Sequence, residues 1–296
     1  MRDGQRTLGF ALLSALFSVA LLTVVVLEMT DATLVGSHLT RNAANAIAAG
    51  LLARSAEVAA ESLLVDQDRR YPGVTAPDQE WGQPWPDVPA GDGFAGFAIH
   101  DEQGKLDLNR VRDGEQRRWL EALFADLELD PALLDAIDAW TRPPDGGGAA
   151  AACALAIPCR PREGPLTSLD ELVLIEGFSP EDVARLRPFV TAFGQAGRKG
   201  VNVNTARPRV LRAMGCDLGD DFRAPPGGYR TTADVVECQG VRGLSIDSDV
   251  FSIEARGTVG DTSRLVVAVV DRRGGKVRRL AWREGPVFPA SPIAVP

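Results

Sequence analysis

The sequence predicts an α+β fold, in which a long N-terminal helix packs on an antiparallel sheet and a mainly helical domain is inserted. Three observations support this prediction. A helix-compatible stretch runs without proline from residue 8 to about residue 64. Three consecutive strands with tight turns lie between residues 249 and 283, and helical segments dominate residues 112–200. With 45% apolar and 24% charged residues among 296, the chain can bury a core of this kind.

The N-terminal helix begins with a segment long enough to cross a membrane. Leu8–Leu27 is a run of twenty residues without charge or proline, and at ~1.5 Å per residue it spans the ~30 Å hydrocarbon core of a bilayer. Arg2 and Arg6 precede this run, so we expect a cytoplasmic N-terminus and the rest of the chain on the other side. Because the first proline is Pro72, the helix is expected to continue beyond the membrane as one rod of roughly 85 Å.

A linker and a first hairpin are predicted after the rod. The linker, residues 66–93, contains five prolines. Phe94–Ile99 is the next predicted strand, and Leu106–Val111 is expected to return beside it after a turn. Together these residues form the segment 66–111.

Residues 112–200 are predicted to be a helical insertion. Helices are expected at Glu115–Leu127 and Pro131–Trp140. Pro165–Phe193 has a helix–hairpin–helix pattern. Its helix ends are marked by polar caps and a glycine, at Thr167 or Ser168, Gly177 and Ser179.

Residues 201–285 are predicted to complete the sheet. Val201–Ala206 is expected to be a short strand, and its Thr205 is expected to cap a helix at Arg207–Met214. Three consecutive strands follow, at Asp249–Thr258, Ser263–Asp271 and Lys276–Arg283. Residues 286–296 are expected to form a loose tail.

Composition and motifs argue against several classes of function. The net charge of −8 disfavours nucleic-acid binding. The only histidines are His38 and His100, and this small number disfavours a histidine-based metal site or triad. Gly91–Gly96 matches G-x-G-x-x-G, but a strand rather than a helix is expected after it, so it does not predict nucleotide binding. Three acidic residues in the hairpin Glu176–Asp182 would repel a phosphate, which favours packing over DNA binding.

The N-terminus resembles that of type IV pilin-like proteins. A short basic leader ends at Gly9, and Phe10 begins the apolar segment. The resemblance implies a prepilin leader at residues 1–9, cleavage between Gly9 and Phe10 by a prepilin peptidase, and N-methylation of the new terminus. It also implies a transmembrane and stem helix at residues 10–65 and a pilin-like fold. Most members carry Glu at mature position five, which pairs with the terminal amine of the neighbouring subunit. This position is Ser14 here. A subunit without the carboxylate suits the filament tip, where no neighbour lies above it.

Three further segments resemble the K component of type II secretion, a large minor pseudopilin. They are Asp101–Asn109, Pro165–Phe178 and Asn202–Met214. The resemblance implies a non-enzymatic subunit of the inner membrane, with a single pass and a periplasmic C-terminal domain. It further implies capping of the pseudopilus tip with the I and J minor pseudopilins, and a part in starting assembly. Other pseudopilins, the prepilin peptidase and inner-membrane secretion components are the further partners expected, and no nucleic acid is.

The family can bind calcium through acidic loop residues, so the resemblance leaves calcium open as a cofactor, while the sequence assigns no metal ligand. Asp101, Glu102 and Asp107 fall in one turn, which we expect to be a solvated acidic turn rather than a calcium site. The loop Thr141–Asp145 is poorer in acidic residues than the corresponding family loop.

Four cysteines, Cys153, Cys159, Cys216 and Cys238, are candidates for disulfides in an exported domain. Pairing of nearest neighbours, Cys153 with Cys159 and Cys216 with Cys238, would close two loops. Four cysteines allow three connectivities, and the sequence alone does not choose among them.

Two other functions stay open from the sequence. One is a minor pilin of a type IV pilus or DNA-uptake system, suggested by the helix–hairpin–helix pattern. The other is a membrane-anchored periplasmic hydrolase, which is the weakest reading because no nucleophile has an identifiable base.

Overall fold

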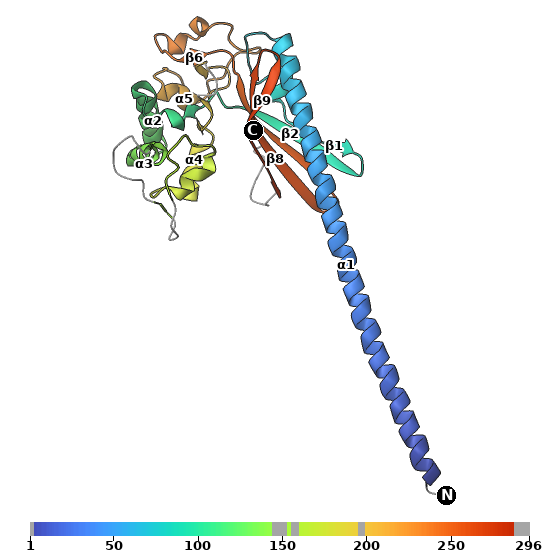
Figure 1. Cartoon of the computed structure of the whole chain (residues 1–296). Helices are drawn as coiled ribbons and strands as arrows, with labels where there is room; N and C mark the ends of the chain where they lie inside the picture. Colours follow the sequence, from blue (N-terminus) through green and yellow to red (C-terminus); the bar gives the residue numbers. More distant parts are fainter. Residues whose placement is uncertain (1–2, 144–152, 155–159, 195–198, 287–296) are drawn as a thin grey trace.

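The computed structural model describes residues 3–143, 153–154, 160–194 and 199–286. Its first element, α1 (Asp3–Arg70), is a single helix of 68 residues. The C-terminal part of α1 lies against a sheet, while the N-terminal part projects alone as a rod (Figure 1). The predicted continuous rod is confirmed, and it extends past residue 65 because proline first appears at Pro72.

Five antiparallel strands form the main sheet, in the order β1-β2-β7-β8-β9. The bounds of these strands are β1 Trp85–Ala90, β2 Gly93–Asp101, β7 Val250–Val259, β8 Thr262–Arg273 and β9 Lys276–Pro286. The predicted C-terminal meander is therefore confirmed. The predicted α+β class, with the long helix against an antiparallel sheet, is confirmed as well.

Two expectations for residues 66–111 are wrong. The proline-rich segment is not only a linker, because it contains β1 and a short 3₁₀ helix, η1 (Glu80–Gly82). Pro86 and Pro89 are tolerated in β1 because it is an edge strand, where a missing N–H breaks no central ladder.

The second wrong expectation concerns Leu106–Val111, which does not return beside β2. Only β3 (Leu106–Asp107) is extended, and it pairs in parallel with β4 (Val190–Thr191) of the helical part. A 3₁₀ helix, η2 (Leu108–Arg110), follows directly. The partner of β2 is instead β7, which comes about 150 residues later in the chain.

The helix packs on the sheet through small residues. Ala53, Ala56, Ala60 and Leu64 lie in one core with Phe251 and its neighbours on β7 and β8. A Cβ atom at Gly257 would lie 2.1 Å from the carbonyl oxygen of Ala49. The glycine therefore lets the helix backbone rest directly on the strand.

A second unit carries most of the remaining helices. Figure 1 shows this helical unit and the hairpin of β1 and β2 on opposite sides of the molecule. Its elements are α2 Gly114–Asp126, α3 Ala132–Thr141, η4 Leu169–Leu174, α4 Pro180–Leu186, β5 Val201–Asn202, α5 Pro208–Ala213, η6 Thr232–Asp234, η7 Val236–Cys238 and β6 Leu244–Ser245. The two predicted helices after residue 112 are confirmed as α2 and α3. The first helix of the hairpin motif is a 3₁₀ helix rather than an α-helix.

The core of this helical unit extends beyond the predicted boundary at residue 200. Val203, Val210, Leu211, Val235 and Cys238 are buried in the same cluster as the side chains of α2 and α3. The segment 201–246 therefore packs with the insertion rather than with the sheet. β5 also pairs with β6 instead of joining the main sheet.

The expected helix cap at Thr205 is wrong. α5 begins after Arg207, and no side chain caps it. The hydroxyl of Thr205 donates instead to the carboxylate of Asp101 at the end of β2. The predicted tail, residues 286–296, lies outside the described residues except for Pro286, the last residue of β9.

Candidate assembly interface

The N-terminal part of α1 exposes large apolar side chains on all sides. They include Leu16, Phe17, Leu21, Leu22, Val25 and Leu27. Among the described residues, Leu13–Arg70 is one helix long and apolar enough to cross a membrane, with a mean hydropathy of 2.1 in its most apolar window. Such side chains need a bilayer or other helices around them.

The predicted cleavage site, Gly9 and Phe10, and the residue at mature position five, Ser14, lie in this helix. Gly9 and Phe10 lie in the first turns of α1. Ser14 lies about one turn further along, where its carbonyl accepts a hydrogen bond from the hydroxyl of Ser18 at 2.9 Å. Cleavage at Gly9–Phe10 stays a prediction.

Beyond the apolar segment, one face of α1 packs on the sheet and the opposite face is open. Ile47, Leu51 and Val58 are exposed by 68%, 57% and 52%. Their spacing of four and seven residues places them on one side of the helix. We call these three residues the open stem face. They extend the exposed apolar surface of α1 from the apolar segment to the part of the helix that packs on the sheet.

Ion pairs fix α1 against β9 on the flank of the sheet. The buried carboxylate of Glu57 lies 2.9 Å from Nε of Arg279 and accepts a hydrogen bond from Nε1 of Trp282 at 3.1 Å. Arg54 pairs with Glu284 at 2.6 Å. These contacts set the position of the stem helix relative to the edge strand.

The acidic turn after β2 is buried, so the expectation of a solvated turn is wrong. The carboxylate of Asp101 accepts hydrogen bonds from Asn202, Thr205 and Ser248, and from the backbone N–H of Gln103. Burial raises the pKa of Asp101, although these hydrogen bonds act in the opposite direction. The turn connects the sheet to the helical unit.

Glu102 faces a different set of partners. Its carboxylate accepts hydrogen bonds from Lys105 at 2.8 Å, Ser252 at 2.7 Å and Thr191 at 2.6 Å. Burial alone would raise the pKa of Glu102, but the ammonium of Lys105 and the hydroxyl donors lower it.

The third acid, Asp107, is also buried and accepts the N–H of Asn109 at 3.0 Å. In the described part of the chain, no three His, Cys, Asp or Glu side chains are grouped so as to hold a metal ion.

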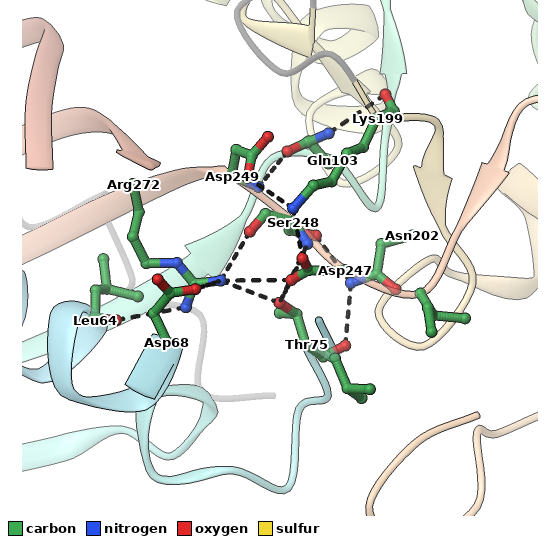
Figure 2. Close-up of polar contacts among 12 residues, drawn as sticks. Leu64, Asp68, Thr75, Gln103, Lys199, Asn202, Asp247, Ser248, Asp249 and Arg272 are labelled. Carbon is green, nitrogen blue, oxygen red and sulfur yellow. Dashed lines mark hydrogen bonds and ion pairs between the residues drawn. The ribbon is translucent and has the colours of Figure 1, made fainter. Parts of the chain in front are cut away.

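A polar junction connects α1, the sheet and the helical unit, and the sequence analysis missed it (Figure 2). We define the junction as Thr75, Lys199, Asp247, Ser248 and Arg272. The guanidinium of Arg272 is only 4% exposed and donates to the carbonyl of Ser248 at 2.9 Å. The hydroxyl of Thr75 donates to Asp247 at 2.8 Å. Arg272 follows directly on the predicted strand Ser263–Asp271, and no local pattern indicates that it is buried at the end of β8.

The hairpin of the helical unit has the turn that its sequence predicts. Gly177 has a φ of +97°, which favours glycine, and Ser179 and Asp182 form a capping box at the start of α4. The hydrogen bonds from Ser179 lower the pKa of Asp182. Glu176 and Glu181 are exposed beside this turn.

Disulfide bonds hold the helical unit. Cys216 is bonded to Cys238, which is one of the two nearest-neighbour pairings considered from the sequence. Cys153 is also disulfide-bonded, while Cys159 lies outside the described residues.

Comparisons with a family model and with solved structures both give matches. Residues 104–195 match the family described as type II secretion system (T2SS), protein K. The fold is similar to a chain in the crystal structure of the GspK–GspI–GspJ complex from the type 2 secretion system of enterotoxigenic *Escherichia coli*, with a TM-score of 0.67 and 18% identity over 85% of this chain and 99% of that chain. A search of curated protein sequences finds no match.

The stem helix, the antiparallel sheet and the inserted helical unit form an α+β fold similar to that of the matched chain of the GspK–GspI–GspJ complex. The family match begins at the turn after β2 and ends within the helical unit, and the structural match covers 85% of this chain. The resemblance to the K-type minor pseudopilin of type II secretion, predicted from the sequence, is thereby confirmed.

Proposed function

We propose that this protein is a non-enzymatic minor pseudopilin that caps the pseudopilus tip of a type II secretion system and helps to start its assembly. The observation that carries the proposal is the unbroken stem helix, α1, with an open apolar face beside a K-type helical unit. A rod of this kind buries its apolar surface when sister helices bundle around it.

Ser14 supports a position at the tip. A carboxylate within an apolar helix bundle needs a cationic partner, since an unpaired buried charge costs several kcal/mol. The terminal amine of a neighbouring subunit would supply that partner inside a filament. With serine at this position, the protein needs no neighbour above it.

The proposed partners are the I and J minor pseudopilins, whose stem helices would pack along α1. The open stem face, Ile47, Leu51 and Val58, offers apolar side chains for this contact. Other pseudopilins, the prepilin peptidase and inner-membrane secretion components are the remaining proposed partners. Before assembly, the protein would sit in the inner membrane with one pass, its N-terminus in the cytoplasm and its globular part in the periplasm.

Co-purification tests this proposal. The full chain is expressed with the I and J pseudopilins of the same system and purified in detergent through a tag on the full chain. We expect I and J to co-elute with the unaltered chain. Failure of both to co-elute would overturn the proposal.

A pair of variants locates the contact. Leu51→Arg places a charge on the open stem face, and Val236→Arg places the same charge on an apolar residue of the helical unit that is at least as exposed. We expect Leu51→Arg to lose I and J and Val236→Arg to retain them. Loss of I and J with Val236→Arg but not with Leu51→Arg would place the interface on the helical unit instead of the stem.

A further inference from the structure

Two chain crossings connect the sheet to the helical unit. The chain leaves the sheet after β2, at residues 102–106, and returns to β7 through residues 246–249. Two backbone connections without side-chain contacts would leave a hinge between the two hydrophobic cores. The outward crossing is held by hydrogen bonds from Asn202 and Thr205 to Asp101. The residues on the return crossing supply the second point at which the helical unit is fixed to the stem.

Arg272 approaches the return crossing from the sheet side (Figure 2). Its Nη2 lies 3.5 Å from the carboxylate of Asp247 and donates to the hydroxyl of Thr75 at 3.4 Å. Its Nη1 donates to the carbonyl of Leu64 in α1 at 3.4 Å, and its guanidinium lies 4.8 Å from the ring centre of Phe251. This one side chain thus contacts the stem helix, the segment after it and the return crossing.

Lys199 approaches the same crossing from the helical unit. Its ammonium pairs with Asp247 and lies 2.8 Å from Asp249. Burial would lower the pKa of Lys199, but these two carboxylates raise it. Burial would likewise raise the pKa of Asp247, but hydrogen bonds from Lys199 and Thr75 and the charge of Arg272 lower it.

Asp247 is therefore held between one cation of the sheet and one cation of the helical unit. Backbone contacts support the same arrangement, because the N–H of Thr75 donates to the carbonyl of Ile246 at 2.9 Å. The desolvation of such charges offsets much of their attraction, so these ion pairs are weak evidence for stability, and the feature that bears on orientation is their fixed geometry.

We propose that Asp247, clamped between Arg272 and Lys199, is an orientation lock that fixes the direction of the helical unit relative to the stem helix. Asp247 is a positioning residue in this role. The lock is a property of the folded chain and holds whichever partners bind it. If the protein is a tip subunit, the lock sets the angle at which the helical unit is presented beyond the filament.

The test measures the distance between the two parts in the full chain in detergent. Exposed Glu181 in α4 and exposed Ser62 in α1 are each changed to cysteine and spin-labelled, and the distance distribution is recorded by electron–electron double resonance. Cys153, Cys216 and Cys238 are all disulfide-bonded, and no described cysteine is free to compete for the label.

Asp247→Asn removes the charge at constant size, and Asp271→Asn is its matched control. Asp271 is ion-paired to two cations as Asp247 is, but its partners Arg273 and Arg278 both lie on the sheet. We expect a single narrow distance peak in the unaltered chain and in Asp271→Asn. We expect loss of that narrow peak in Asp247→Asn, with the stem and helical unit still folded by circular dichroism.

A narrow, unshifted peak in Asp247→Asn would overturn the proposal. Equal broadening in both variants would also overturn it, because the effect would then be general loosening of the fold. Neither result depends on binding of I or J, so failure of the lock is distinct from failure of the proposed function.

Discussion

Glu57 of α1 and Arg279 of β9 face each other where the stem helix meets the edge of the sheet, with the carboxylate oxygen 2.9 Å from Nε of the arginine. The carboxylate is 2% exposed, while the guanidinium is 46% exposed. The glutamate therefore depends on this arginine and on Trp282 for its partners, because water hardly reaches it.

Removing Arg279 should weaken the attachment of the stem. Breaking a buried ion pair costs about 3–5 kcal/mol, and we expect about 2 kcal/mol for Arg279→Ala because the arginine is half exposed. Chemical denaturation of the full chain in detergent measures the change. Arg278→Ala on the same strand is the control, since Asp271 keeps its ion pair with Arg273. Equal losses in the two variants would contradict the special role of the Glu57 contact.

Gly257 should be intolerant of any side chain. Its Cβ would lie 2.1 Å from the carbonyl oxygen of Ala49, so Gly257→Ala forces the helix away from β7. Overpacking of this kind typically costs about 1–3 kcal/mol. Gly285→Ala in β9 is the control, because no atom lies within 4 Å of its Cβ position. Thermal melting should show a lower midpoint for the first variant only; an unchanged midpoint for Gly257→Ala would refute the close packing.

Asp101 should make the fold less stable as the pH rises. Its pKa is raised by burial, so the folded chain keeps a proton that the unfolded chain releases above about pH 4. The stabilising contribution of Asp101 is complete below the unfolded pKa and is lost as the pH rises through the folded pKa. Asp101→Asn removes this dependence.

The measurement is the difference in unfolding free energy between the unaltered chain and Asp101→Asn at several pH values. We expect the unaltered chain to lose stability relative to the variant from pH 4 upward, about 1.4 kcal/mol for each unit by which the folded pKa exceeds the unfolded one. A difference that is constant with pH, or that grows in favour of aspartate, would be incompatible with a buried carboxyl of raised pKa.

The disulfide between Cys216 and Cys238 should stabilise the helical unit alone. It closes a loop with a sequence separation of 22 residues, for which loop entropy predicts about 3 kcal/mol. In the double variant Cys216→Ser, Cys238→Ser, hydrogen exchange should quicken in α2 and α5 and stay unchanged in β7 and β8, because the two cores are separate. Equal quickening in the sheet would mean that the cores unfold together.

The rod and the meander were predictable because their signals are local and long. The absence of proline before Pro72 predicts one helix, and alternation with tight turns predicts β7, β8 and β9. The pairing of β2 with β7 and of β3 with β4 was not predictable, since it joins segments far apart in the chain. Nothing in the two residues of β3 indicates a parallel partner.

The junction was hidden for a different reason. Arg272, Lys199 and Asp247 are charged residues, and sequence patterns assign such residues to the surface. The same bias made Asp101 and Glu102 appear solvated. The burial of Asp101 and Glu102 follows from partners in three separate segments, around residues 191, 205 and 248–252, which only the assembled fold brings together.

The central claim is that this chain is processed and assembled as a pseudopilin, and the mass of its N-terminus tests that claim most directly. The full chain is coexpressed with a prepilin peptidase and its intact mass is measured. We predict loss of the first nine residues and a methylated Phe10 at the new terminus. A chain that keeps Met1 through Gly9 in the presence of an active peptidase would contradict the account.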